Sequence, residues 1–190
     1  MPSNFAEYAR RIAIQARKAD TTPTDAQREA MNHAAGHVHI HGFNITICNP
    51  KGSLRKSKKN NRQYLMHAHY GYIRRTTSSD GEQLDVYIGE HPESQLVFVI
   101  DQLDDEGNFE EYKCVMGCRN YQEAKKLYLS HHPEGWEDKH LGEVRGYTTS
   151  QFREWLKKEK LLKKSASVMG TPNATTSLPQ SPTSSGASTA

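Results

Sequence analysis

The amino-acid sequence predicts an α+β domain built on a mainly antiparallel sheet. Segments with the two-residue alternation of strands fill most of residues 37–116, and segments with helical spacing precede and follow them. The most apolar short run, "SQLVFVIDQL", is followed by the turn "DDEGN" and by "FEEYKCVMG", which together have the pattern of a hairpin. We therefore expect hairpins arranged in one sheet, with helices flanking it.

Two helices are expected ahead of the sheet. Apolar side chains recur at helical spacing through residues 4–18, "NFAEYARRIAIQARK". A shorter helix should follow Thr24, which is a suitable N-cap because Gln27 stands three residues later, at the capping-box position. Gly36 should end this region, because glycine commonly terminates helices.

The next segments alternate between strands and loops. "HVHIHGFNITIC" alternates in polarity, with a change of phase at Gly42, and "RQYLMHAHYGYIRR" resumes as a strand. The basic, turn-rich segment between them, "NPKGSLRKSKKNNR", is expected to be an exposed loop. After the hairpin, helices are predicted at "YQEAKKLYLSHH" and at "TTSQFREWLKKEKLLKK", the second capped by Thr149 or Ser150.

Length and composition predict one domain with extensions. We expect a helical extension over 1–23, the domain over 24–163, and a disordered tail over 164–190. Residues 165–190 hold twelve Ser/Thr, three Pro and no charged residue, too little apolar surface to offset the entropy of ordering.

The bulk properties exclude several classes of partner. The formal net charge of +3 is small for 190 residues, so a nucleic-acid partner is not expected, and the lack of a long apolar run argues against a membrane. Three cysteines make no disulfide framework, and the first residues do not resemble a secretory signal. We expect a cytoplasmic protein and leave its oligomeric state open.

Acidic residues gather at the entrance to a strand. Asp80, Glu82 and Asp85 precede "VYI" by a few residues, and a second acidic group follows across the predicted hairpin. The members of that group are Asp101, Asp104, Asp105, Glu110 and Glu111, with Lys113 close behind. Carboxylates from two neighbouring segments can bind a hard cation such as Mg²⁺ together with phosphate oxygens. Acid-rich hairpin turns are also common as solvated structures, and spacing alone leaves both interpretations open.

Other polar patterns permit weaker hypotheses. The basic segment could contact phosphate or nucleic acid, although it lacks the interleaved aromatic residues typical of nucleic-acid patches. His37, His39 and His41 could share one strand face and bind Zn²⁺, or they could simply face solvent. The spacing of "CVMGC" differs from that of metal or redox cysteine pairs and favours ordinary packing.

Four segments, "NPKGS", "HYGYIRRT", "DGEQLDV" and "EEYK", together resemble the soluble inorganic pyrophosphatases, which depend on Mg²⁺. The run "DAQREAMNHAAGHVHIHGFNITICNPKGS" and the closing "YTTSQFREWLK" are similar to the pyrophosphatase-like domains of bacteriophage and prophage proteins of the polyvalent type. The resemblance covers about residues 24–160. It implies a closed or nearly closed five-stranded β-barrel with flanking helices, a Mg²⁺ cofactor and a small phosphorylated substrate.

The resemblance also implies a role for individual residues. The metal-binding residues would be Asp80, Glu82, Asp85, Asp104 (or, in second place, Asp101) and Glu111. The catalytic group would be Asp85, Tyr70 and Lys113, and the substrate-binding group Lys51, Arg55, Lys113 and Tyr70. The implied reaction is hydrolysis of a phosphoanhydride by water activated between two cations.

Departures from the family pattern affect this interpretation. Cys48 stands where an acid is expected before "NP", and Glu82 replaces a shorter aspartate. An acid is also missing after "KGS". A phosphate- or nucleotide-binding module that has lost catalysis is therefore the alternative function. A purely structural or interaction role, with the tail as linker, is the third hypothesis.

Overall fold

The computed structural model describes residues 4–30, 32–56 and 62–163, so the predicted tail lies outside the described residues. Its helices are α1 (Asn4–Ala16), α2 (Asp25–Glu29), α3 (Tyr121–Leu129), α4 (Glu137–His140) and α5 (Thr149–Lys158). Its strands are β1 (Gly36–Ile40), β2 (Phe43–Asn49), β3 (Leu54–Lys56), β4 (Gln63–Leu65), β5 (His69–Ile73), β6 (Asp85–Ile88), β7 (Leu96–Leu103), β8 (Phe109–Met116) and β9 (Leu141–Thr148). None of these helices is long and apolar enough to cross a membrane.

Seven strands form one sheet in the order β1-β2-β5-β6-β8-β7-β9, and β3 pairs with β4 in a small second sheet. Neighbouring strands are antiparallel except β6 and β8, which run parallel. The predicted α+β class with a mainly antiparallel sheet is confirmed. In the pairing of the described residues β1 and β9 are the two edges of the large sheet, so the implied five-stranded barrel stays a prediction.

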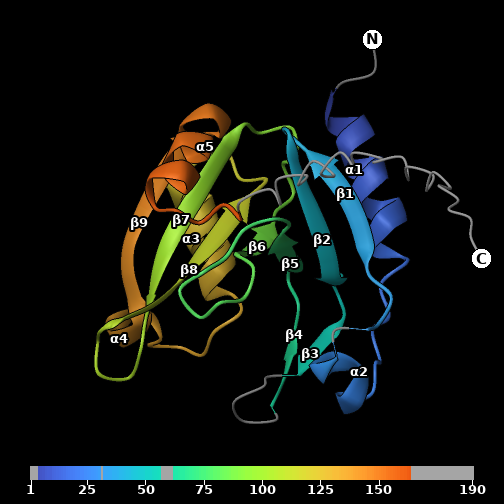
Figure 1. Ribbon diagram of the computed structural model, residues 1–190, viewed down its shortest axis with the longest axis horizontal. Helices are drawn as coiled ribbons and strands as arrows, with labels where there is room; N and C mark the ends of the chain where they lie inside the picture. The colour runs from blue at the N-terminus through green and yellow to red at the C-terminus, as the bar shows by residue number, and fades with distance from the viewer. Residues whose placement is uncertain (1–3, 31, 57–61, 164–190) are drawn as a thin grey trace, which may run out of the picture.

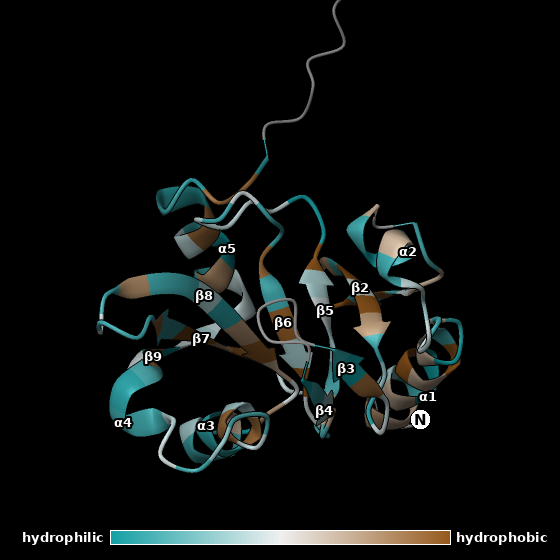
Figure 2. Cartoon of the chain, turned by 90° about the horizontal axis from the view of Figure 1, so that it is seen from below, coloured by the Kyte–Doolittle hydropathy of each residue, from teal (hydrophilic) through white to brown (hydrophobic). Residues whose placement is uncertain are grey.

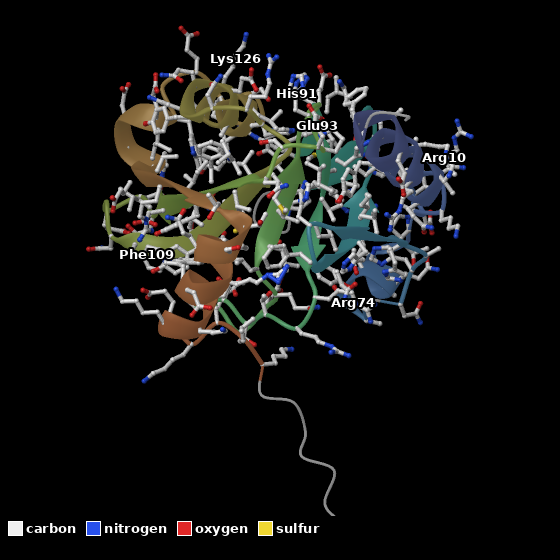
Figure 3. All side chains as sticks on the ribbon, turned by 90° about the horizontal axis from the view of Figure 1, so that it is seen from above. Arg10, Arg74, His91, Glu93, Phe109 and Lys126 are labelled. Atoms are coloured by element: carbon white, nitrogen blue, oxygen red, sulfur yellow. The ribbon has the colours of Figure 1, made fainter. Side chains whose placement is uncertain are left out.

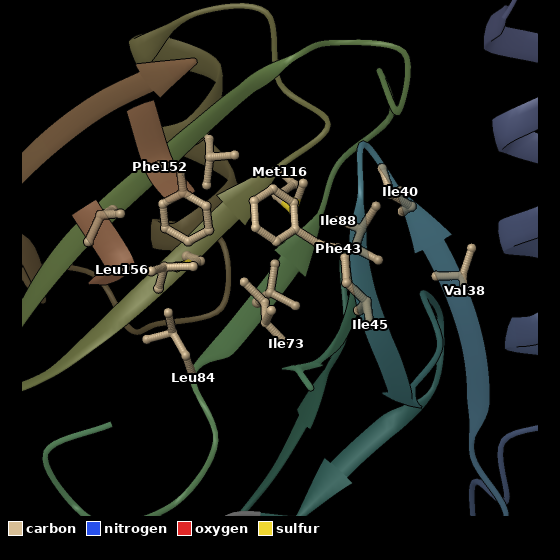
Figure 4. Close-up of a cluster of buried hydrophobic side chains, with 14 of the residues drawn as sticks. Val38, Ile40, Phe43, Ile45, Ile73, Leu84, Ile88, Met116, Phe152 and Leu156 are labelled. Atoms are coloured by element: carbon tan, nitrogen blue, oxygen red, sulfur yellow. The ribbon is translucent and has the colours of Figure 1, made fainter. Parts of the chain in front are cut away.

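Helix α5 lies beside β7 and β9 at one end of the sheet (Figure 1), and its side chains reach the β1–β2 hairpin. Phe152 and Leu156 of α5 are buried in the larger hydrophobic cluster, and Figure 4 shows them facing Phe43 and Ile73 across its interior. The rings of Phe43 and Phe152 are 5.3 Å apart in an edge-to-face contact. The Arg153 guanidinium also donates to the carbonyl of His41 at 2.7 Å. The helix therefore holds the β1–β2 hairpin against the distant strands.

Helix α1 shares this core. Ile12 and Ala16 are buried in the same cluster as the sheet residues, and the helix lies along β1 in Figure 1. Its apolar stripe is thus the reason that residues 4–16 fold onto the sheet. The predicted extension over 1–23 contributes a helix to the core of the predicted domain.

The turns confirm some predictions and correct others. His41 and Gly42 both have positive φ, 47° and 83°, as a two-residue turn between twisted strands requires, so the phase change at Gly42 is a hairpin. Thr24 and Gln27 form the predicted capping box. The basic segment is only partly a loop, because β3 in it pairs with β4. Helix α5 is capped by Thr148, one residue before the predicted candidates.

The opposite face of the sheet carries a second, more polar cluster. Its buried members include Tyr70, Tyr87 and Tyr128, and α3 covers this face near β8. Figure 2 shows β5 and β6 side by side at the centre of the sheet, with α3 and α4 beyond β7 and β8. Beyond the end of β6 that lies away from Asp85, His91 and Glu93 form a half-buried pair 3.3 Å apart (Figure 3).

Candidate functional site

Three adjacent strands place the central site residues on one face of the sheet. Tyr72 of β5 lies opposite Asp85 of β6, and Asp85 lies opposite Lys113 of β8. Tyr70 is two residues before Tyr72 and therefore points to the same side. Strand alternation and register thus bring Tyr70, Asp85 and Lys113 together, although they are far apart in the sequence.

The Asp85 carboxylate is the centre of this group. Its Oδ2 accepts a hydrogen bond from the Tyr70 hydroxyl at 2.5 Å. The same oxygen forms an ion pair with Lys113 Nζ, also at 2.5 Å. Lys113 Nζ also lies 2.8 Å from Glu111 Oε2. One ammonium therefore lies between two carboxylates.

Arg55 adds a second fixed cation beside Tyr70. Its Nη2 donates to the Tyr70 hydroxyl at 3.3 Å, and the guanidinium carbon lies 4.4 Å from the centre of the Tyr70 ring. The residue comes from β3, the short strand in the basic segment. Pairing of β3 with β4 is thus what brings an arginine from that segment to the site.

Burial determines the protonation of the site. It raises the pKa of Tyr70 well above the usual range, and the Asp85 charge adds to the effect, so Tyr70 remains a hydrogen-bond donor. Burial by itself lowers the pKa of Lys113, but the carboxylates of Asp85 and Glu111 oppose this effect, and the pKa lies well above its ordinary value. The site therefore keeps a protonated lysine at neutral pH.

The acidic turn lies next to the start of β8. Ser79 Oγ donates to the Glu110 carbonyl at 2.9 Å, which ties the turn to that strand. Asp80 accepts from the backbone N–H of Glu82 at 2.9 Å, and both side chains are exposed. Burial raises the pKa of Glu111, Lys113 lowers it, and the charges of Asp85 and Asp80 raise it further, so Asp80 is within electrostatic range of the site.

The structure does not bring Asp104 or Asp101 to Asp85. Asp104 lies in the β7–β8 turn and accepts from the backbone N–H groups of Glu106 and Asn108, contacts that lower its pKa. Asp101 precedes Gln102 on β7, so it faces the other side of the sheet, where it pairs with Arg145. Both carboxylates already have local structural partners.

Two other sequence candidates lie apart from the Asp85 group. Lys51 forms an exposed ion pair with Glu90, which follows the opposite end of β6 from Asp85. His37 and His39 share a face of β1 and contact Thr46 and Asn44 of β2, whereas His41 lies beyond the strand in the turn. These contacts are within the hairpin, and the histidines do not converge.

Cys48 is close to the site without being a suitable ligand. The Asp85 charge and the Arg55 charge both influence it, but burial is the main effect and raises its pKa to about 11. A thiol with this pKa stays protonated at neutral pH, and sulfur is a poor ligand for hard cations. Cys48 therefore cannot take over the metal-binding role of the acid that the resemblance leads us to expect at this position.

Sequence reasoning missed Gln102 and Tyr128. Gln102 is 7% exposed on β7, and its side chain contacts Glu110, Glu111 and the Tyr128 hydroxyl. The sequence does contain a signal for Gln102, because it is a polar residue within the most apolar run of the chain. A buried amide there needs hydrogen-bond partners, which points to a polar cluster around it.

The oxygen donors of the site can hold a divalent cation only together with further ligands. Across residues 4–30, 32–56 and 62–163, no three His, Cys, Asp or Glu side chains are grouped closely enough to hold an ion by themselves. Mg²⁺, however, commonly uses only one or two protein carboxylates and completes its shell with water and substrate phosphate. The ammonium of Lys113 between Asp85 and Glu111 shows that this position stabilises positive charge. The oxygen donors present thus fit Mg²⁺ in company with a phosphate.

Paired carboxylates beside two fixed cations and a buried phenol define a class of site suited to a phosphate ester or anhydride with its cation. A family model for inorganic pyrophosphatase matches residues 25–157, which is more than half of the chain. The chain belongs to the inorganic pyrophosphatase family. No curated protein matches its sequence.

Proposed function

We propose that this protein hydrolyses a phosphoanhydride, either inorganic pyrophosphate or a related nucleotide, with Mg²⁺ as cofactor. The observation that carries the proposal is the Asp85 carboxylate, held by Tyr70 on one side and by Lys113 on the other. Family membership over residues 25–157 supports the substrate class. The resemblance noted in the sequence further supports a phage or prophage context and a cytoplasmic location as part of the proposal.

Each residue of the group has a role in this proposal. Asp85 and Glu111 would hold the cation, with Asp80 and Glu82 of the adjacent turn contributing through water or substrate. When bound, Mg²⁺ neutralises phosphate charge and lowers the pKa of a coordinated water. Lys113 and Arg55 would bind phosphate oxygens, Arg55 through its planar pair of donors. Tyr70 keeps its proton and donates to Asp85, which orients that carboxylate.

A binding module without catalysis is the second candidate. It is favoured by Cys48 at an expected acid position and by the small number of carboxylates that converge. In this alternative Lys113 and Arg55 would still bind the phosphates, while the carboxylates would bind the cation too weakly for hydrolysis. The protein would then bind pyrophosphate or a nucleotide without cleaving it.

Phosphate release separates the two candidates. The full chain is incubated with pyrophosphate and, separately, with nucleoside triphosphates, with Mg²⁺ or with chelator, and released phosphate is measured. We expect Mg²⁺-dependent release that falls at least about 100-fold in Asp85→Asn. Asp138→Asn, an exposed acid of α4, is the matched control and should retain activity.

Two results would contradict the proposal, the first by excluding hydrolysis and the second by excluding the Asp85 site. The first is wild-type protein that releases no phosphate while calorimetry shows that it binds pyrophosphate, which establishes the binding module. The second is Asp85→Asn with undiminished activity, which removes the proposed site. Protein that neither binds nor cleaves these compounds would support the structural or interaction role.

A further inference from the structure

An irregularity in the β7–β8 hairpin turns two neighbouring acids toward one partner. Glu111 lies opposite Gln102, but the register then shifts so that Phe109 lies opposite Leu103. Glu110 is thus the extra residue of a β-bulge, a feature that re-aims side chains and often lies beside active sites. Adjacent strand residues ordinarily face opposite sides, yet here both Glu110 and Glu111 contact Gln102.

The Gln102 amide binds both carboxylates. Its Nε2 lies 2.9 Å from Glu110 Oε2 and 3.2 Å from Glu111 Oε1. A primary amide has two N–H hydrogens, so one is available for each acid. Hydrogen bonds to ionised carboxylates are stronger than neutral ones, and the amide adds no charge that would compete with a cation.

The orientation of this amide is determined from α3 and the segment after it. Trp136 Nε1 can only donate, and it donates to the Tyr128 oxygen at 3.2 Å. The Tyr128 hydroxyl therefore directs its own hydrogen to Gln102 Oε1, 2.9 Å away. With Oε1 accepting, Nε2 must face the acids. Burial raises the pKa of Tyr128, so the hydroxyl keeps this hydrogen.

We propose that Gln102, oriented by Tyr128, is the positioning residue that sets the cation affinity of the site through Glu110 and Glu111. This inference rests on the proposed function. One oxygen of Glu111 is held by Gln102, which directs the other to Lys113 and the Asp85 side of the site. Without Gln102 the two acids would separate to reduce their repulsion, and Glu111 would lose its orientation.

The expected size of the effect follows from comparable contacts in other proteins. Removing a hydrogen-bond partner that orients a metal ligand typically weakens metal affinity or activity about 10–100-fold. Gln102→Leu keeps the approximate volume and removes the donor. Tyr128→Phe keeps the ring and removes only the hydroxyl, so Gln102 can rotate; a smaller loss in the same direction is expected.

The experiment measures Mn²⁺ binding to the full chain by electron paramagnetic resonance, with and without inorganic phosphate. In parallel it measures the Mg²⁺ concentration that gives half-maximal phosphate release. We expect Gln102→Leu to raise the Mn²⁺ dissociation constant about 10–100-fold and to raise the half-maximal Mg²⁺ concentration similarly. Controls are Gln122→Leu and Tyr121→Phe, both exposed on α3. A merely structural role for Gln102 would lower the folded fraction without changing these concentrations.

The outcomes distinguish the two proposals. Wild-type protein that binds Mn²⁺ with the same affinity as Gln102→Leu and Tyr128→Phe overturns this inference and leaves the proposed hydrolysis intact. Wild-type protein that releases no phosphate, but whose Mn²⁺ affinity depends on Gln102, overturns hydrolysis and supports the inference. Wild-type protein that binds no Mn²⁺, with or without inorganic phosphate, overturns both. If Gln102→Leu does not fold, Tyr128→Phe decides by the same measurements.

Discussion

Replacement of Lys113 by methionine tests the central arrangement of charges most directly. The Lys113 side chain is 9% exposed and lies between Asp85 and Glu111, whose side chains are 23% and 18% exposed. Methionine keeps most of the aliphatic length and removes the ammonium. Two partly buried carboxylates would then lie beside each other with no cation between them.

The burial of these side chains gives the expected loss in the free energy of unfolding. Removing one partner of a buried ion pair commonly costs about 3–5 kcal/mol, and the residual exposure of both acids places this site at about 3 kcal/mol. For a protein of this size, 1 kcal/mol corresponds to about 2–4 °C in melting temperature. We therefore expect Lys113→Met to melt about 6–12 °C below wild type in chelator.

Added cation should reverse much of this loss. A ligand at 100 times its dissociation constant stabilises the folded state by about 2.7 kcal/mol. Because the ammonium no longer competes for the two acids, Mn²⁺ should raise the melting temperature of Lys113→Met by more than that of wild type. The assay is thermal unfolding followed by circular dichroism, with and without Mn²⁺.

The control is Lys157→Met. Lys157 pairs with Glu154 on the surface of α5, where both side chains are more than half exposed. Exposed pairs contribute about 0–1 kcal/mol, so this variant should melt close to wild type with or without Mn²⁺. If Lys113→Met melts within about 2 °C of wild type, or if Mn²⁺ stabilises both proteins equally, Lys113 does not hold the two carboxylates as described.

Two further predictions concern buried titratable groups. Burial, with the charge of His131 adding to it, lowers the pKa of His132 from 6.5 to about 3, and the ring stacks on Trp136 at 4.3 Å. Its stabilising contribution is therefore complete above the unfolded pKa and is lost as pH falls below 6.5. Urea unfolding should show a loss of about 2 kcal/mol between pH 7 and pH 5 that is clearly smaller in His132→Phe, and equal losses in both proteins would contradict the assignment. Cys48, with a pKa of about 11, should react with a disulfide reagent at pH 8 about 100-fold more slowly in folded than in urea-unfolded protein. Peptide mapping of the labelled chain measures this rate, and labelling of Cys48 at equal rates in both states would show that the thiol is not shielded.

Local patterns were sufficient for much of the fold. The capping box of Thr24 and Gln27 and the amphipathic helix over α1 depend on residues a few positions apart, and both are confirmed. The change of phase predicted at Gly42 is also found, as the turn of a hairpin. Strand β9 was not predicted. It contains Gly142 and Gly146 and has mostly half-buried or exposed side chains at the sheet edge, so its alternation is weak.

Some residues of the candidate site could likewise be predicted from local patterns, and others could not. Tyr70 and Asp85 could be proposed from a compact motif, and Lys113 from its spacing to Glu111, because each signal lies within one segment. Asp104 and Lys51 could not be placed from spacing. The first turns back onto its own hairpin, and the second pairs with Glu90 beyond the opposite end of β6. Sequence distance does not state the direction in which a side chain leaves its strand when turns and bulges intervene.

Patterns within single segments were thus enough to indicate the α+β class, the resemblance to pyrophosphatases and the acidic turn that begins at Asp80. The charges that meet in the site are set by the packing of the whole sheet. Parallel pairing of β6 with β8 puts Asp85 beside Lys113, and the bulge at Glu110 turns a second acid toward Gln102. Pairing of β3 with β4 carries Arg55 to Tyr70. These contacts depend on register between segments separated along the chain, which is set by packing of the whole sheet rather than by any one segment's pattern.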